Sequence, residues 1–242
     1  MNLIIDEGNT RIKLAVFNKD HLVEIQLSTI ESCEEKLNEM LLKYRFHSLI
    51  ISSVTDKILR FVDHLSISNK FVLSNTTPVP FKNLYNTPKT LGVDRIALTT
   101  AACVKYPKQN TLIIDAGTCV TYDFINNEGA YLGGAIAPGL AMRYKSMHVF
   151  TQKLPLLEPK AQSVFFLGTT TEESIHSGVL NGMAFEIDGM IKSYQQKYGY
   201  INVILTGGDA DFLCKQLKNS IFVNPNFLLE GLNEVLTYQH QR

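Results

Sequence analysis

Short apolar runs separated by polar turns fill the first part of the chain. NLIID, IKLAVFN, LVEIQLS, SLIISSV and KFVLSN have the length and composition of β-strands. Between the third and fourth run, ESCEEKLNEMLLKYRF has apolar side chains at helical spacing, namely Leu37, Met40, Leu41 and Tyr44. The pattern therefore predicts an α/β chain.

The second part of the chain repeats this order. DRIALTTAACVKY predicts a helix, and TLIIDAGT, VTYDFIN and AYLGGAIAPG then follow the strand, turn, strand order of the N-terminus. INVILTGGDADFLCKQL predicts a strand, a Gly-Gly turn and a helix, and PNFLLEGLNEVLTY predicts a closing helix. We therefore expect two related domains, residues 1–110 and 111–242, although no linker marks the boundary.

A long helix is expected from TTTEESIHSG to KYG, with Thr170 and Glu173 spaced as a capping box. Its apolar face carries Ile175, Val179, Met183, Ile187, Met190, Ile191 and Tyr194. Gly178 and Gly182 lie one turn apart on this helix, although each glycine lowers helix stability by about 1 kcal/mol relative to alanine. Something is expected to approach them closely, either a neighbouring element of the fold or a second subunit.

Composition excludes several classes of protein. Lys and Arg number 23, as do Asp and Glu, so no net charge attracts the 242-residue chain to nucleic acid or an anionic membrane. No apolar run reaches bilayer length and the N-terminus resembles no signal peptide, so a cytoplasmic protein is expected. The four cysteines and six histidines are scattered, which favours buried thiols over a zinc site.

Two strands end in the same arrangement of an acid, a glycine and a hydroxyl. The first loop has Asp6, Gly8, Asn9 and Thr10, and the second, with Asp115, is DAGT. Gly8 lets backbone N–H groups approach an anion, and the carboxylate of Asp6 can hold a hydrated Mg²⁺ that bridges phosphate oxygens. One such loop alone fits an ordinary β-turn. Two in equivalent places favour a pair of phosphate-facing turns, and neither a P-loop nor a GxGxxG motif offers another nucleotide site.

The segment YNTPKTLGVDRIA places an acid beside an arginine at the start of a helix, after a loop rich in proline and polar residues. Asp94 alone is explained by helix capping. Arg95 is harder to explain, because a cation is unfavourable at a helix N-terminus and an arginine fork suits a carboxylate. The pair predicts a substrate that carries an alcohol to deprotonate and a carboxylate.

The chain resembles the type III pantothenate kinases through DEGNT, YNTPKTLGVDR, DAGT, GGAIAPG, TTTEESIHSG, TGGDA and LLEGL, in the family's order. The resemblance implies duplicated actin-like (ribonuclease H-like) domains with mixed sheets flanked by helices and an ATP cleft between them. It also implies transfer of the ATP γ-phosphoryl group to pantothenate, the first step of coenzyme A biosynthesis, by a homodimer that uses Mg²⁺ and a monovalent cation, K⁺ or NH₄⁺.

The resemblance also implies the roles of individual residues. Asp94 is the implied general base and Asp115 the monovalent-cation ligand. The implied ATP contacts are Asp6, Glu7, Gly8, Asn9, Thr10, Arg11, Ile12, Lys13 and Thr118. The implied pantothenate contacts are Tyr85, Gly92, Val93, Asp94, Arg95 and Thr171.

Two departures and two rival functions remain. Glu7 adds a negative charge beside the first loop unless its side chain points away, and Cys119 stands where alanine is frequent. The rivals are another actin-fold small-molecule kinase and a non-enzymatic transcriptional accessory factor. LGVDR argues against the first, and the presence of Asp6, Asp94 and Asp115 argues against the second.

Overall fold

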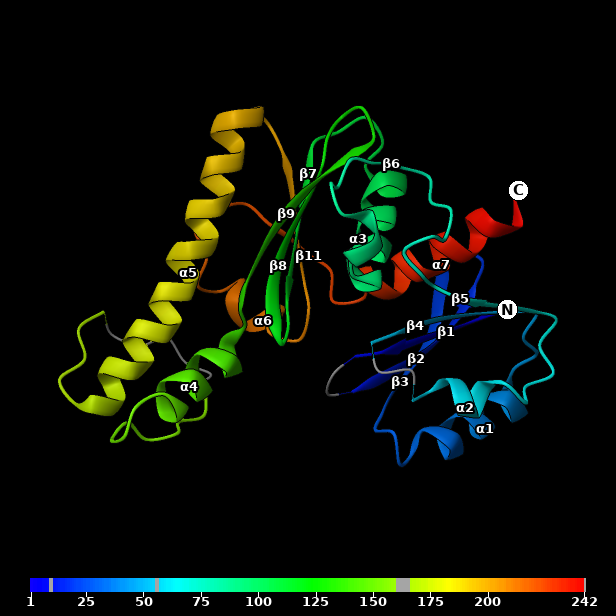
Figure 1. The fold of residues 1–242 in the computed structure, drawn as a ribbon, viewed down its shortest axis with the longest axis horizontal. Helices are drawn as coiled ribbons and strands as arrows, with labels where there is room; N and C mark the ends of the chain where they lie inside the picture. Colours follow the sequence, from blue (N-terminus) through cyan, green and yellow to red (C-terminus); the bar gives the residue numbers. More distant parts are fainter. Residues whose placement is uncertain (9–10, 55–56, 160–165, 242) are drawn as a thin grey trace. The chain divides into compact units, whose positions relative to one another are not determined.

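The computed structural model describes residues 1–8, 11–54, 57–159 and 166–241. Contacts divide the chain into two compact units (Figure 1). The first unit contains Met1–Pro107, Gly129–Tyr131 and Phe227–Arg242, and the second contains Lys108–Glu128 and Leu132–Asn226. The closing helix therefore belongs to the first unit by contact, and the division into 1–110 and 111–242 stays a prediction.

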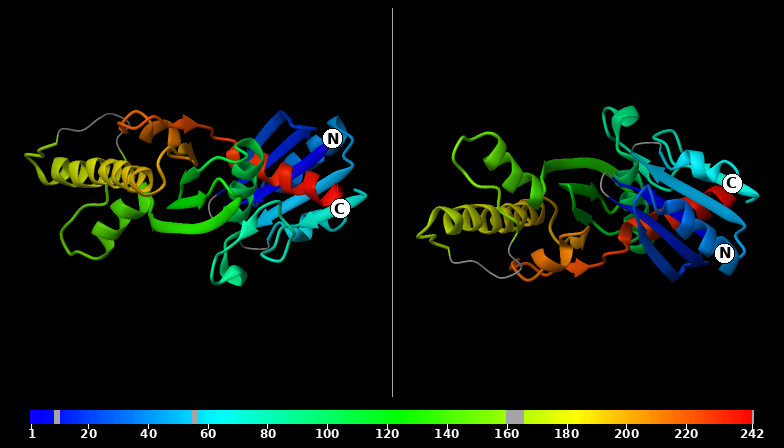
Figure 2. Two further views of the ribbon diagram at one scale, coloured as in Figure 1. Left: turned by 90° about the horizontal axis from the view of Figure 1, so that it is seen from above. Right: turned by 90° about the horizontal axis from the view of Figure 1, so that it is seen from below.

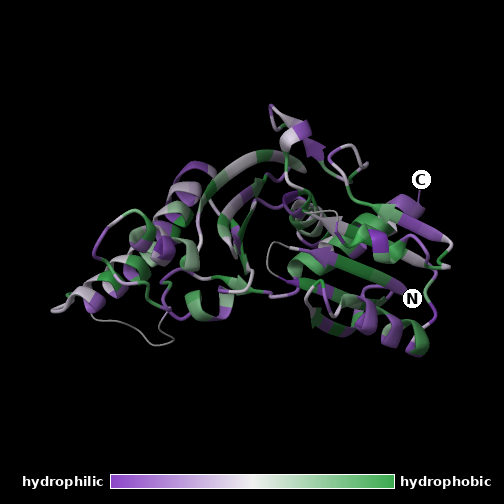
Figure 3. Cartoon of the chain, turned by 60° about the horizontal axis from the view of Figure 1, so that its bottom comes forward, coloured by the Kyte–Doolittle hydropathy of each residue, from purple (hydrophilic) through white to green (hydrophobic). Residues whose placement is uncertain are grey.

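The first unit is built on a five-stranded sheet in the order β3-β2-β1-β4-β5. Its strands are β1 (Asn2–Glu7), β2 (Ile12–Asn18), β3 (His21–Ser28), β4 (Ser48–Ser53) and β5 (Asn69–Val72). β1 runs antiparallel to β2 and parallel to β4. All of the strands predicted here are present, and the hydropathy colouring shows how apolar residues follow them (Figure 3).

The sheet of the first unit is covered on both faces. Leu3 and Ile5 of β1 pack with Leu37 and Met40 of helix α1 (Cys33–Lys43), as the helical spacing predicted. The short helix α2 (Leu59–Val62) lies on this side too. Helices α3 (Val93–Lys105) and α7 (Phe227–His240) pack together, and both contact β4. A Cβ at Gly231 would lie 2.1 Å from the carbonyl oxygen of Ala97, so only glycine permits this close crossing of α3 and α7.

The second unit contains β7 (Thr111–Ala116), β8 (Cys119–Ile125), β9 (Ala130–Pro138, which begins in the first unit), β10 (Asn202–Thr206) and β11 (Phe222–Val223). The sheet order is β11-β10-β7-β8-β9-β6, where β6 is Lys82–Asn83. β7 runs antiparallel to β8 and parallel to β10, as β1 does to β2 and β4. The two sheets therefore share one strand order, which confirms the duplicated fold.

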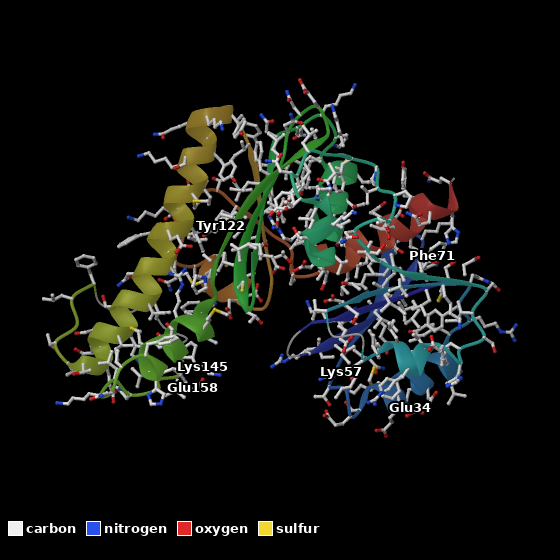
Figure 4. All side chains as sticks on the ribbon, viewed as in Figure 1. Glu34, Lys57, Phe71, Tyr122, Lys145 and Glu158 are labelled. Atoms are coloured by element: carbon white, nitrogen blue, oxygen red, sulfur yellow. The ribbon has the colours of Figure 1, made fainter. Side chains whose placement is uncertain are left out.

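One face of the second sheet is covered by helices α4 (Leu140–Val149), α5 (Thr171–Tyr198) and α6 (Ala210–Leu213). α5 is one unbroken helix (Figure 2), and the hydroxyl of Thr170 accepts the backbone N–H of Glu173 at 3.2 Å, as the capping box predicted. Tyr122 of β8, labelled in Figure 4, donates to Glu186 of α5 at 2.9 Å. Among the described residues, none of the helices could span a membrane.

Candidate active site

The first part of the site lies at the carboxyl end of β1, where Asp6 is aligned with Lys13 of β2 and Ser52 of β4. Side chains aligned on neighbouring strands point to the same face of a sheet. The pKa of Asp6 is raised to about 6, chiefly by burial and to a smaller extent by the nearby charge of Asp94, while the charge of Lys13 and a hydrogen bond from Ser52 oppose the rise. The two acids singled out in the first half of the sequence are therefore close enough to interact.

Glu7 occupies the opposite face of β1. Its carboxylate accepts hydrogen bonds from the Ser53 hydroxyl and from the Ile58 N–H, the latter at 3.4 Å. The charge that departs from the family pattern is thus directed away from the Asp6 face. Glu7 thus links Ser53 at the end of β4 to Ile58 at the N-cap of α2.

At the ends of β1 and β2, the Gly8 N–H donates to the Arg11 carbonyl at 3.1 Å. Asn9 and Thr10, predicted to contact ATP, lie outside the described residues. Ile12 is buried in the core beside α1, so its side chain cannot reach a ligand. Any contact of Ile12 with a nucleotide would therefore use its backbone.

The predicted substrate motif forms the first turn of α3. Gly92 occupies the N-cap position, so Asp94 lies within the first turn and does not cap the helix itself. The Asp94 carboxylate accepts the Arg95 N–H at 2.8 Å. A Cβ at Gly92 would lie 2.4 Å from Oδ1 of Asp94, so a larger residue would displace the carboxylate that is predicted to act as the base.

Arg95 and Tyr85, predicted from separate parts of the motif, meet in the structure. The guanidinium carbon of the buried Arg95 lies 5.5 Å from the centre of the Tyr85 ring, within cation–π range. Tyr85 in turn packs on the ring of Tyr131 of β9 at 6.0 Å. Sequence reasoning missed Tyr131, because a tyrosine in a strand carries no signal beyond β propensity.

The second part of the site lies at the carboxyl end of β7. Asp115 is aligned with Thr121 of β8 and Thr206 of β10. Two turns that contain glycine pack against the end of this strand. Gly207 has a φ of 96°, and a Cβ there would lie 2.4 Å from Oδ1 of Asp115. A Cβ at Gly139 would lie 2.1 Å from the Gly117 carbonyl oxygen, which explains why GGAIAPG and LTGGDA carry glycine beside the acid.

The remaining predicted contacts of the second unit are accessible. Thr118 is exposed in the turn after β7, and its carbonyl accepts the Gly139 N–H at 3.1 Å. Thr171 is exposed at the first position of α5. In the first unit, Asp6 thus lies near Asp94, while Glu7 and the side chain of Ile12 face away from it. In the second unit, Thr118 lies at the end of β7 and Thr171 at the start of α5.

Solved structures with the same fold belong to several functional types. A putative Baf family transcriptional activator from Campylobacter jejuni has a TM-score of 0.65 at 21% identity, covering 99% of this chain and 100% of that one. A glucokinase from an Antarctic psychrotroph has a TM-score of 0.52 at 13% identity, with 98% of each chain covered. At these identities the likeness shows the fold alone, which is that of the actin and hexokinase class.

Sequence relatives are more specific. A type III pantothenate kinase from Flavobacterium johnsoniae is 45% identical over 246 aligned positions, which cover 100% of this chain and 98% of that protein. The family described as Type III pantothenate kinase matches residues 2–193. The chain belongs to the type III pantothenate kinase family.

Replacing Asp6 by Asn should flatten the pH dependence of stability in metal-free protein. The pKa of Asp6 is raised from 3.8 to about 6 on folding, so the folded state holds the proton more tightly than the unfolded chain does. The contribution of Asp6 to the free energy of unfolding is therefore fully present below about pH 4. It falls by up to about 3 kcal/mol as the pH rises past 6.

Urea unfolding in EDTA across this pH range measures the effect. Asp6→Asn should lose the slope, whereas Asp63→Asn, which changes an exposed carboxylate of the same unit, should keep it. An unchanged slope in Asp6→Asn would contradict the burial of a shifted carboxyl at this position.

Proposed function

We infer that this chain, as a type III pantothenate kinase, transfers the γ-phosphoryl group of ATP to pantothenate and so makes 4′-phosphopantothenate, the first step of coenzyme A biosynthesis. The family match supports the reaction. The observation that carries the assignment of roles is that Asp6 and Asp94, a phosphate-side acid and a substrate-side acid, lie in one unit and near enough for the charge of Asp94 to raise the pKa of Asp6.

In this proposal Asp94 is the general base. Its carboxylate accepts a hydrogen bond from the Arg95 N–H at 2.8 Å at the start of α3. It occupies space that a side chain at position 92 would take, which the glycine there leaves open. From there it would take the proton of the primary hydroxyl of pantothenate as that oxygen attacks the γ-phosphorus. Positioning of this kind is the main requirement of phosphoryl transfer.

Arg95 is proposed to bind the carboxylate of pantothenate. Its guanidinium lies 5.5 Å from the centre of the Tyr85 ring, and the planar fork of an arginine suits a two-point interaction with a carboxylate. Gly92 and Val93 would line the same pocket through their backbone. Thr171 of the partner subunit is proposed to contact pantothenate across the dimer interface, because its side chain is exposed at the start of α5.

The cations are proposed to bind at the two strand ends. Asp6 would hold Mg²⁺, a hard cation that takes oxygen ligands and would neutralise charge on the phosphates of ATP. A buried carboxylate with a raised pKa suits this role, because a cation removes the electrostatic cost of its ionisation. Asp115 would hold K⁺ or NH₄⁺. The described residues include no group of three His, Cys, Asp or Glu side chains able to hold a metal alone, so phosphate, water or hydroxyl oxygens must complete either site.

A homodimer is proposed to form through α5. Gly178 and Gly182 are exposed, and no described atom outside the helix and its neighbours would lie within 4 Å of a Cβ at either, so packing among the described residues does not explain them. Phe185 on the same face is 53% exposed, and Phe166, which packs near it at 6.4 Å, is 78% exposed. An apolar and small surface of this kind is typical of a self-association site.

The two rival functions make different predictions. A sugar kinase of this fold would phosphorylate hexoses and ignore pantothenate. An accessory factor would need no acid at Asp6, Asp94 or Asp115, although all of these are present. The fold that this chain shares with the Campylobacter protein is therefore no argument for a role as an accessory factor.

Asp94→Asn should lower kcat by ~10²- to 10⁴-fold, because a general base typically contributes that much. The amide is close in size to the carboxylate, so ATP binding and melting temperature should change little. Steady-state kinetics with pantothenate measures the effect, and Asp63→Asn controls for loss of a carboxylate. Near-normal turnover would leave Asp94 only a structural role in the first turn of α3.

Arg95→Lys should raise the KM for pantothenate by about tenfold or more and leave the KM for ATP within about twofold, because an ammonium replaces a bidentate fork. Initial rates with each substrate varied in turn separate the two effects. Equal increases in both KM values would argue against recognition of the pantothenate carboxylate by Arg95.

Gly182→Leu should weaken both association and turnover. A leucine there would obstruct the close approach of a second helix. Gln195→Leu, which adds the same side chain at an exposed position of α5 away from this face, should leave the dimer intact. Sedimentation velocity reads the oligomeric state directly. A fully active monomer would rule out the proposed interface and any need for it in catalysis.

A further inference from the structure

The ends of β1 and β7 carry equivalent rows of side chains. In the first unit, Asp6 is aligned with Lys13 on the antiparallel neighbour and with Ser52 on the parallel neighbour. In the second unit, Asp115 is aligned with Thr121 and Thr206 in the same places. Because the two sheets share one strand order, Thr206 is the counterpart of Ser52.

The two rows differ in charge. The first contains its own cation, Lys13, whose charge lowers the pKa of Asp6. The second has the neutral hydroxyl of Thr121 at the equivalent position. A second carboxyl group, Asp123, follows on the same face of β8. It is fully buried and accepts a hydrogen bond from the Thr121 hydroxyl at 3.1 Å. The second row therefore consists of oxygen-bearing side chains, with no lysine at the position that Lys13 holds in the first row.

Thr206 also differs from its counterpart in its hydrogen bonding. Ser52 donates to Asp6. Thr206 is 1% exposed, and its Oγ1 has no hydrogen-bond partner among the described residues. A buried hydroxyl without a partner is costly and uncommon, and it calls for an explanation such as an ion that the atom binds.

The surrounding backbone holds Thr206 on the strand beside Asp115. Gly207 follows Thr206 directly, and a Cβ there would lie 2.4 Å from Oδ1 of Asp115, so the carboxylate lies against the turn that Thr206 begins. The Asp209 N–H donates to the Ala116 carbonyl at 3.0 Å and fixes the turn on the end of β7. The side chains of Thr206 and Asp115 are thus held on adjacent strands by the pairing of β10 with β7 and by this turn.

We propose that the hydroxyl oxygen of Thr206 is a ligand of the monovalent cation that Asp115 holds, with Thr121 positioned on the other side of the carboxylate. The inference rests on the proposed function, which supplies the cation. A neutral oxygen suits an ion of single charge, as carbonyl oxygens do for K⁺ in channels. Thr206 would therefore help to determine which monovalent ion the site accepts.

The test compares Thr206→Val, Thr206→Ser and Thr206→Ala with the unchanged chain. Valine has nearly the shape of threonine but no oxygen, and serine keeps the oxygen. Thr111→Val is the matched control, because Thr111 is buried on the same face of β7 at the opposite end of the strand. Asp115→Ala removes the carboxylate itself.

Melting temperature is first measured in choline chloride and then with increasing KCl, in the presence of ADP and Mg²⁺. Thr206→Val should melt at or above the temperature of the unchanged chain in choline, because it removes an unsatisfied hydroxyl. Its half-saturating KCl concentration should rise by about tenfold or more. Thr206→Ser and Thr111→Val should keep the normal response. Thallium(I) NMR on the same proteins reads ion binding without turnover.

The outcomes separate this inference from the proposed function. A normal K⁺ response in both Thr206→Val and Thr206→Ala would overturn the role of Thr206 and leave the Asp115 site standing. An unchanged chain that responds to neither K⁺ nor thallium(I) would overturn the cation site and this inference together. If Thr206→Val does not fold, a reduced response in Thr206→Ala with a normal one in Thr206→Ser supports the inference.

Discussion

Alignment of side chains across three neighbouring strands is the constraint on which the site depends. A carboxylate at the end of a central strand can be buried only if the strands on either side bring it compensating groups. Lys13 and Ser52 do this for Asp6, and β-sheet register alone sets their positions. A shift of one residue in either strand would turn these side chains to the opposite face.

The same constraint explains the glycines of the second unit. Gly139 and Gly207 are required where backbone passes within contact distance of the end of β7, so they serve the architecture of the loop. In the sequence both glycines stand within GGAIAPG and TGGDA, two of the motifs that carry the family resemblance. The structure adds a reason that holds without any ligand, since a side chain at Gly207 would displace Asp115.

Much of the fold could be predicted, because strand runs and helical spacing are local signals. The five strands of the first sheet, α1, α3, α5 and α7 were all expected. α4 was not, because Leu140–Val149 follows GGAIAPG with only a weak apolar face. The partners within the site were also missed. Ser52 and Thr206 are ordinary strand residues, and only the pairing of distant strands brings them beside the acids.

Phosphorylation of pantothenate by the purified chain tests the central claim most directly. The protein is incubated with ATP, Mg²⁺ and K⁺, and with pantothenate or a panel of sugars, and the products are identified by mass spectrometry. A pantothenate kinase should give 4′-phosphopantothenate and ADP in equal amounts, with no phosphorylated sugar. Phosphorylation of a sugar in place of pantothenate, or no product from a folded protein that binds ATP, would contradict it.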